Sequence, residues 1–374
     1  MPLRPHQVRA AEQFVKQCTD TGMLLWHRMG TGKTNTVLAT LMNYPHDRVL
    51  LLLPKALKDV WVQEIEKNFG GAVPFQLQII DFDTFFNKHM AQQVKEAVAK
   101  ASLVVADEAH HLAEHAHMSR DMLRGKRCLL VTGTPVYHAL TDLAVLVNIA
   151  ADADEDVLPL KRRKLEQLVQ RGDMYARIHN YVQFYDFAAD APSQQHVIYP
   201  SVRLVKLTAN ANQLPVAKPG SIVYTQSKDK LKKVADQLQR AGVPMLYLQN
   251  LDQQVLDAFA TGHYVLLLDG AVAEGVSIPN ANVLHVLEPV SSYGLQEQLY
   301  ARLKRPVSQP ALHTIYQYIQ PGVHVDHTLA NLVRQLRQQM ARQQTNSPTC
   351  GLRVRERNCT VWMSPTSPGT CQDK

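Results

Sequence analysis

Short apolar runs alternate with longer mixed segments over the first 150 residues. Each run is continuous rather than alternating, which is typical of parallel strands buried on both faces of a sheet. We expect strands over Met23–His27, Val49–Leu53, Leu77–Ile80, Leu103–Ala106 and Cys128–Val131, and helices over Lys33–Met42, Leu57–Asn68 and Ala91–Lys100. This alternation predicts a doubly wound, parallel-sheet α/β domain over residues 1–150.

A second α/β domain is predicted over residues 219–322, where the same pattern returns. Its expected elements are a helix over Lys228–Ala241 and strands over Ser221–Thr225, Pro244–Gln249, Tyr264–Asp269, Asn282–Glu288 and His313–Ile319. Residues 151–218 open acidic, turn basic and end aromatic, and we expect them to form a helical linker. A polar C-terminal helix is expected over 323–344. The Ser-, Thr-, Pro- and Arg-rich tail over 345–374 has no core-forming pattern, which predicts disorder.

Composition narrows the class of protein. A length of 374 residues suits two domains, since single cores stop growing beyond roughly 250–300 residues. With 45% hydrophobic and 20% charged residues, the chain is neither disordered nor collagen-like. No apolar run approaches the ~20 residues of a membrane span, and five scattered cysteines form no disulfide framework. We therefore expect a soluble, intracellular protein without a membrane partner, whose net charge of +7 permits a polyanionic one.

The strongest chemical signal is a glycine-containing turn between a predicted strand and a predicted helix. It reads His27-Arg28-Met29-Gly30-Thr31-Gly32-Lys33-Thr34. Backbone N–H groups in such a turn, together with the helix amino terminus, can surround phosphate oxygens. In a P-loop of this kind the Met29–Thr34 segment binds the nucleotide, Lys33 reaches the β- and γ-phosphates, and Thr34 holds Mg²⁺. His27 stands where the strict pattern has its first glycine.

Two carboxylates follow the buried run Leu103–Ala106, in the order Asp107-Glu108-Ala109-His110. Beside a P-loop, the strand-end Asp107 is expected to bind Mg²⁺ and Glu108 to orient and deprotonate the attacking water. A rival pattern overlaps them, because His111-Leu112-Ala113-Glu114-His115 spells H-x-x-E-H, a zinc-protease signature. The overlap with the carboxylate pair favours nucleotide hydrolysis over zinc catalysis.

Several motifs in order resemble the superfamily 2 helicases and translocases. They are Met29–Thr34, Asp107–His110, Thr132-Gly133-Thr134-Pro135 and Gln298-Leu299-Tyr300-Ala301-Arg302-Leu303-Lys304-Arg305. The resemblance runs from Leu3 to about Ile319 and implies two RecA-like domains that close on ATP and Mg²⁺. Leu53–Leu57, with Trp61 and Glu64, is similar to motif Ia, which touches the nucleic-acid backbone. The Thr132–Pro135 segment resembles motif III, which couples ATP state to strand grip.

The resemblance also assigns roles to single residues. Gln7, within Leu3-Arg4-Pro5-His6-Gln7, is implied to read adenine, and Gly275, within Asp269–Ser277, to make a turn near the nucleotide. Arg302 and Arg305 are implied to reach across the cleft to the γ-phosphate, where their charge would stabilise the transition state. Ala301 replaces the usual glycine of this last motif.

Within the superfamily the motifs are most similar to the Swi/Snf-like group. Leu284–Pro289 and the run from Arg305 to Tyr318 also resemble a viral branch, which holds the poxvirus nucleoside triphosphate phosphohydrolase I and the early-transcription-factor helicase subunit. This implies an ATP-driven motor in viral transcription, bound to double-stranded DNA through backbone phosphates, with RNA polymerase or transcription factors as partners. Two alternatives stay open: a DEAH-type RNA helicase, and a nucleotide-gated scaffold with little turnover.

Overall fold

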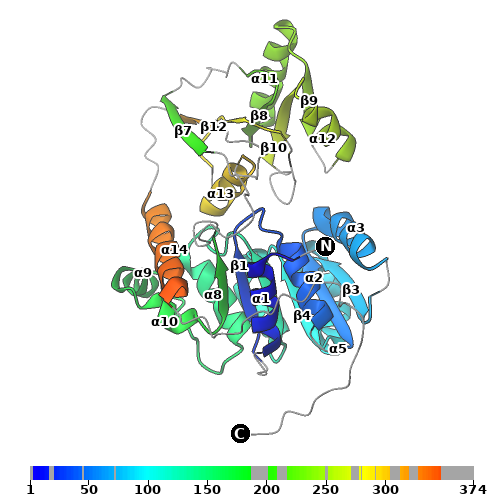
Figure 1. The fold of residues 1–374 in the computed structure, drawn as a ribbon, viewed down its shortest axis with the longest axis vertical. Coiled ribbons are helices and arrows are strands. Elements are labelled where there is room, and N and C mark those ends of the chain that lie inside the picture. Colours follow the sequence, from blue (N-terminus) through cyan, green and yellow to red (C-terminus); the bar gives the residue numbers. More distant parts are fainter. Residues whose placement is uncertain are drawn as a thin grey trace.

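The computed structural model describes residues 3–16, 21–43, 46–70, 73–186, 201–208, 217–248, 252–270, 278, 280–290, 292–303, 312–319 and 327–346. These residues form two sheets of six strands each, and helices surround both sheets (Figure 1). All the strand pairs are parallel. The predicted fold class, with two RecA-like α/β domains, is therefore confirmed.

The first sheet has the strand order β3-β2-β4-β5-β1-β6. Its strands are β1 (Met23–His27), β2 (Arg48–Leu53), β3 (Gln76–Asp81), β4 (Leu103–Asp107), β5 (Cys128–Thr132) and β6 (Val182–Tyr185). Successive residues of β1 enter different hydrophobic clusters: Met23 and Leu25 pack on one face, Leu24 and Trp26 on the other. Since both faces are covered, β1, β4 and β5 are buried along their whole length, as their continuous apolar runs predict.

Helices cover both faces of this sheet. One cluster receives side chains from α1 (Pro5–Lys16), α2 (Lys33–Asn43) and α3 (Lys58–Phe69). The other cluster receives side chains from α5 (Ala91–Lys100), α6 (His111–Glu114), α7 (Ala116–Leu123), α8 (Leu140–Ala151), α9 (Arg162–Arg171) and α10 (Met174–Ile178). Short helical turns join these elements: η1 (Lys55–Leu57), α4 (Phe82–Phe85) and η2 (Lys88–Met90).

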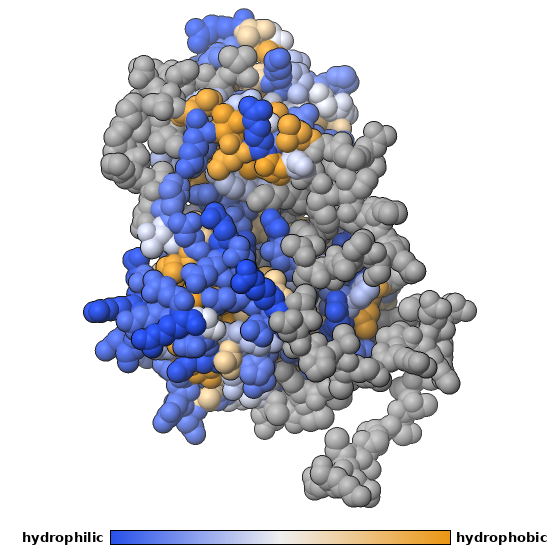
Figure 2. Space-filling model, turned by 60° about the vertical axis from the view of Figure 1, so that its left-hand side comes forward, coloured by the Kyte–Doolittle hydropathy of each residue, from blue (hydrophilic) through white to orange (hydrophobic). Residues whose placement is uncertain are grey.

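The second sheet has the order β7-β12-β11-β8-β10-β9. Its strands are β7 (Ser201–Thr208), β8 (Ser221–Thr225), β9 (Met245–Leu248), β10 (Val265–Asp269), β11 (Val283–Val286) and β12 (Leu312–Ile319), and its helices are α11 (Lys228–Arg240), α12 (Gln253–Ala260) and α13 (Tyr293–Ala301). Hydrophobic side chains gather on the surface of this domain beside β7 and β12 (Figure 2), where Leu204 and Leu312 are exposed. The strands agree with the predicted ones to within about two residues at each end.

The segment expected to be a helical linker, 151–218, does contain two helices, but it also supplies a strand to each sheet. Leu165 and Val169 of α9 and Met174 and Ile178 of α10 are buried in the core of the first domain. Strand β6 pairs with β1, and β7 pairs with β12. A description as a linker alone therefore needs correction, because part of this segment belongs to each domain.

The C-terminal helix α14 (Thr328–Asn346) packs on the first domain, although it follows the second in sequence. Figure 1 shows it beside α9 and α10. Leu336 and Met340 are buried in the first core, and Gln339 donates a hydrogen bond to the Val169 carbonyl at 2.6 Å. The predicted tail lies outside the described residues from position 347 onward. No helix in the described ranges is long and apolar enough to cross a bilayer.

If α14 is part of the first core, Leu336→Ala should lower the free energy of unfolding of that domain by about 2–5 kcal/mol, the usual effect of a cavity in a core. The matched control Gln338→Ala, at an exposed position of the same helix, should stay within about 0.5 kcal/mol of the parent. Urea unfolding followed by the fluorescence of Trp26 and Trp61 reports on this domain. Equal effects of the two substitutions would contradict the packing.

Candidate active site

The turn between β1 and α2 has the backbone geometry that its glycines predict. Gly30 and Gly32 have φ angles of +78° and +79°, a region that residues with a side chain rarely adopt. The Thr31 hydroxyl donates to the Arg28 carbonyl at 2.6 Å, which holds the turn closed. Lys33 is the first residue of α2, and Thr34 is the second. The unpaired N–H groups at this helix end and the open space above Gly30 suit an anion.

Helix α1 supports this turn from below. The Gln7 amide nitrogen donates to the carbonyls of Gly32 at 2.9 Å and Thr31 at 3.3 Å, and its amide oxygen accepts the Arg4 N–H at 2.8 Å. A His6 ring nitrogen lies 3.1 Å from the Thr31 carbonyl. The contacts of Gln7 therefore position the turn, and its implied reading of adenine stays a prediction.

His27, at the position of the missing glycine, is fully buried at the end of β1. Its ring meets those of His6 and Tyr185 edge-on, while His6 and Tyr185 stack on each other at 3.7 Å. Neither ring nitrogen of His27 has a hydrogen-bond partner. Burial, followed by the nearby positive charges of His6 and Lys33, lowers the pKa of His27 to about 3, so the ring is neutral.

The carboxylate of Asp107 lies at the end of β4 and is 5% exposed. The Trp61 indole donates to it at 2.8 Å, and the Glu108 backbone N–H donates at 3.0 Å. Burial, reinforced by the charge of Glu108, raises the pKa of Asp107 to about 6, whereas Lys33 and these two hydrogen bonds oppose the rise. Glu108 has a φ of +49°, a strained conformation for a residue with a side chain, and such strain concentrates at functional sites.

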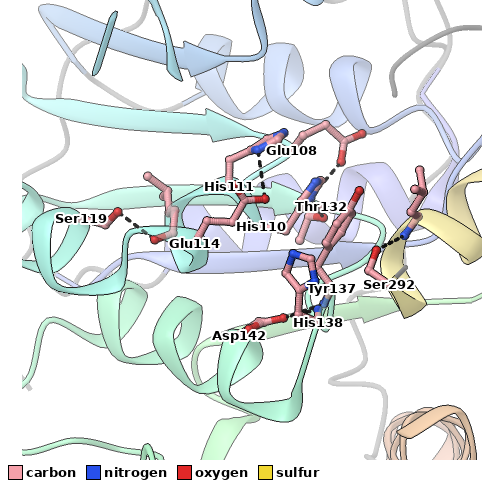
Figure 3. A network of polar contacts seen from close by, with 12 residues as sticks. Glu108, His110, His111, Glu114, Ser119, Thr132, Tyr137, His138, Asp142 and Ser292 are labelled. Atoms are coloured by element: carbon pink, nitrogen blue, oxygen red, sulfur yellow. Dashed lines mark hydrogen bonds and ion pairs between the residues drawn. The ribbon is translucent and has the colours of Figure 1, made fainter. Parts of the chain in front are cut away.

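Glu108 belongs to a network that leads from β4 toward the second domain (Figure 3). A Glu108 carboxylate oxygen lies 3.5 Å from Nδ1 of His110, and the same nitrogen lies 3.2 Å from the Thr132 hydroxyl at the end of β5. The His110 ring stacks on Tyr137 with 4.5 Å between ring centres and an interplanar angle of 2°. The structure thus brings together Asp107–His110 and Thr132–Pro135, which lie apart in the sequence.

Residues of the second domain and of α14 line a narrow cavity together with the glycine-containing turn. Its lining residues are Arg28, Met29, Gly133, Thr134, Glu297, Ala301 and Arg337. Arg302, at the end of α13, is buried, with 6% of its surface exposed. Arg305 and Gly275 lie outside the described residues, so the structure does not place them. The motif that contains Arg302 therefore adjoins the turn through Ala301.

The alternative zinc pattern does not have the helical geometry it needs. Helix α6 ends at Glu114, and His115 has left the helical conformation, with φ −120° and ψ 46°. His111 and His115 therefore do not share one helix face. His115 packs on Phe86 at 4.2 Å instead.

Three contributors to the site were not predicted as such. Trp61, assigned to a nucleic-acid contact element, binds the Asp107 carboxylate, and Tyr137 had no assigned role. Arg337 reaches the cavity from α14 and pairs with Glu297 at 2.9 Å. The only sequence signal for Trp61 was a large aromatic residue in a predicted helix, and nothing local singled out Tyr137 or Arg337.

The buried neutral state of His27 predicts acid sensitivity. The ordinary pKa of 6.5 applies in the unfolded chain, so the unfolded chain binds a proton that the folded one excludes between pH 6.5 and about 3. Stability is therefore lost as the pH falls through this window, by about 2 kcal/mol between pH 7 and 5. His27→Phe should remove this part of the loss in urea titrations at the two pH values. The control His117→Gln, at an exposed histidine, should keep it. An unchanged slope in His27→Phe would refute the assignment.

Comparison with known proteins gives related results. Residues 1–137 match the family described as type III restriction enzyme, res subunit. The chain is 29% identical over 170 residues to "Putative ATP-dependent RNA helicase L538" of Acanthamoeba polyphaga mimivirus, covering 44% of this chain and 36% of that protein. It is 25% identical over 193 residues to the "DNA repair and recombination protein RAD54-like" of Danio rerio, covering 39% of this chain and 26% of that protein.

Among solved structures, the Sulfolobus solfataricus SWI2/SNF2 ATPase core in complex with dsDNA is 14% identical, covers 91% of this chain and 93% of that chain, and has a TM-score of 0.43. The chain spans about a third or less of the length of the two relatives above. The resemblance carried by the motifs is thereby supported: the chain is similar to superfamily 2 helicases of the Swi/Snf-like kind, with a viral protein among its relatives.

Proposed function

We propose that the chain hydrolyses ATP with Mg²⁺ and uses the cycle to move along a nucleic acid. The observation that carries the proposal is the meeting of Lys33, at the amino end of α2, with the buried carboxylates Asp107 and Glu108. Lys33 is close enough to lower the pKa of Asp107. Strands β1 and β4 flank β5, so their carboxyl ends lie at one edge of the sheet, where ligands bind in open α/β folds.

The residues of this edge fit a magnesium nucleotide. The turn over Met29–Gly32 and the amino end of α2 hold the phosphates, and Lys33 neutralises them. The Thr34 hydroxyl and the Asp107 carboxylate hold Mg²⁺, which would stabilise the charge on the phosphates. Glu108 orients and deprotonates the water, and it carries a buried oxygen without a hydrogen-bond partner for this task.

The second domain completes the site in this proposal. Arg302 and Arg305 stabilise charge that develops on the γ-phosphate, and Gly275 provides a turn beside the nucleotide. The burial of Arg302 at the end of α13 and the contact of Ala301 with the cavity favour this role for the helix. Closing and opening of the two domains would then move the nucleic acid by one step in each cycle.

Double-stranded DNA is the preferred substrate in this proposal. The Swi/Snf-like motifs and the name of the RAD54-like relative favour DNA. The name of the mimivirus relative favours RNA, so RNA is the second candidate. Binding through backbone phosphates requires no base recognition and suits a chain of net charge +7. RNA polymerase or transcription factors are proposed partners on the resemblance to the viral branch alone.

Lys33→Ala should lower ATP hydrolysis by at least about a hundredfold, because it removes the charge that faces the phosphates. Lys100→Ala, at an exposed position of α5, is the control and should retain the parent rate. Phosphate release measured at saturating Mg²⁺ and ATP tests both variants. Turnover retained in Lys33→Ala would overturn the assignment of the site. A parent protein that binds ATP without turnover would instead support the scaffold alternative.

Duplex DNA should stimulate hydrolysis by the parent protein more than duplex RNA of the same length does. The stimulation should fall steeply as salt rises from about 50 to 200 mM, because phosphate contacts release counterions. It should not depend on base sequence. A larger effect of RNA would replace DNA as the substrate, and indifference to both polymers at low salt would contradict the motor.

A further inference from the structure

Helix α13 of the second domain comes very close to the first domain at Gly294. The Gly294 N–H donates to the Tyr137 carbonyl at 2.9 Å. A Cβ at this position would lie 2.1 Å from Cδ2 of Tyr137, 2.5 Å from its Cγ and 2.8 Å from its Cα, distances that real contacts do not reach. Gly294 is not among the described glycines with positive φ. The glycine is therefore required for space, at a cost of about 1 kcal/mol in helix propensity.

The backbone of Tyr137 is held firmly where it meets this helix. One carboxylate oxygen of Asp142, near the start of α8, accepts the N–H groups of Tyr137 at 3.0 Å, His138 at 2.6 Å and Ala139 at 2.9 Å. Tyr137 is only 7% exposed. Because its backbone is fixed in this way, a displacement of α13 is transmitted to its ring rather than absorbed by the loop.

The ring of Tyr137 lies against His110, which itself faces Glu108. Figure 3 shows Tyr137 between His110 and the helix that begins after Ser292. The stack has 4.5 Å between ring centres, and the His110 nitrogen lies 3.5 Å from the Glu108 carboxylate. His110 is fully buried. Gly294, Tyr137, His110 and Glu108 thus form one continuous line of contacts from the second domain to the carboxylate that is proposed to activate water.

The same helix ends at Ala301, and Arg302 follows as its cap. A nine-residue helix is rigid, so a change of its position at Gly294 also moves the arginine. Its Glu297 is held by Arg337 of α14, which belongs to the first domain. The contact at Tyr137 therefore sets two things together: the orientation of Glu108 through His110, and the approach of Arg302.

We propose that Tyr137 is a positioning residue that links the placement of α13 to the orientation of Glu108, and that Gly294 is needed to let α13 reach it. This inference rests on the proposed hydrolysis of ATP. Coupling through packed side chains requires a contiguous path, and each contact in this path is present in the structure. The tyrosine acts through His110 and touches no reacting atom itself.

The test measures kcat and KM for ATP with saturating duplex DNA. Tyr137→Ala removes the ring that stacks on His110 and should lower kcat at least about tenfold, since a misplacement near 1 Å can cost more, while KM for ATP changes less than about twofold. Tyr137→Phe keeps the ring and the carbonyl that accepts from Gly294, so it should restore kcat. Gln296→Ala, on the same helix, is the control for an alanine in α13 and should match the parent.

Gly294→Ala should lower kcat in the same way, because the added methyl group pushes α13 away from Tyr137. Combining it with Tyr137→Ala removes two of the atoms that the methyl group meets, so the double variant should be no slower than Tyr137→Ala alone. Multiplying effects would overturn the proposal, as would an unchanged kcat in either single variant that melts like the parent. Absence of ATP hydrolysis in the parent would defeat the proposed function itself, which separates the two failures.

Discussion

Burial of the strands on both faces is the constraint on which the rest of the molecule depends. Strands β1, β4 and β5 expose almost nothing, so polar groups can stand only where the strands end. Parallel pairing then gathers those ends at one edge of the sheet. The same burial withdraws Asp107 from water, which raises its pKa to about 6 and leaves a carboxylate that needs partners. The indole of Trp61 meets that need from α3.

Elements with a strong local pattern were predictable, and elements that depend on distant partners were not. The strands of both cores have continuous apolar runs, and the turn before Lys33 has a spacing of glycines that few other structures require. Strand β6 has four residues with a glutamine among them, and β7 is an edge strand, so neither pattern stands out. The side of the molecule that α14 covers depends on partners in α9 and α10, which its own sequence does not specify.

The candidate site divides along the same line. Lys33, Asp107 and Glu108 lie within short motifs whose geometry follows from strand, turn and helix. The contact of Trp61 with Asp107 joins residues 46 positions apart, and that of Gly294 with Tyr137 joins the two domains. No local pattern encodes such pairs. Their partly or fully buried polar groups, including Glu297 and Arg337, favour one relative placement of the domains, because such groups are stable only when they are paired.

The return of α14 to the first domain has a consequence for the order in which the protein is made. A ribosome completes the strands of the first sheet early, by Tyr185, yet Leu336 and Met340 of the same core emerge only after the whole second domain. Domains usually fold as units in the order of synthesis. Here the domain that starts first must finish last, and until then an apolar surface beside α9 and α10 stays open to chaperones.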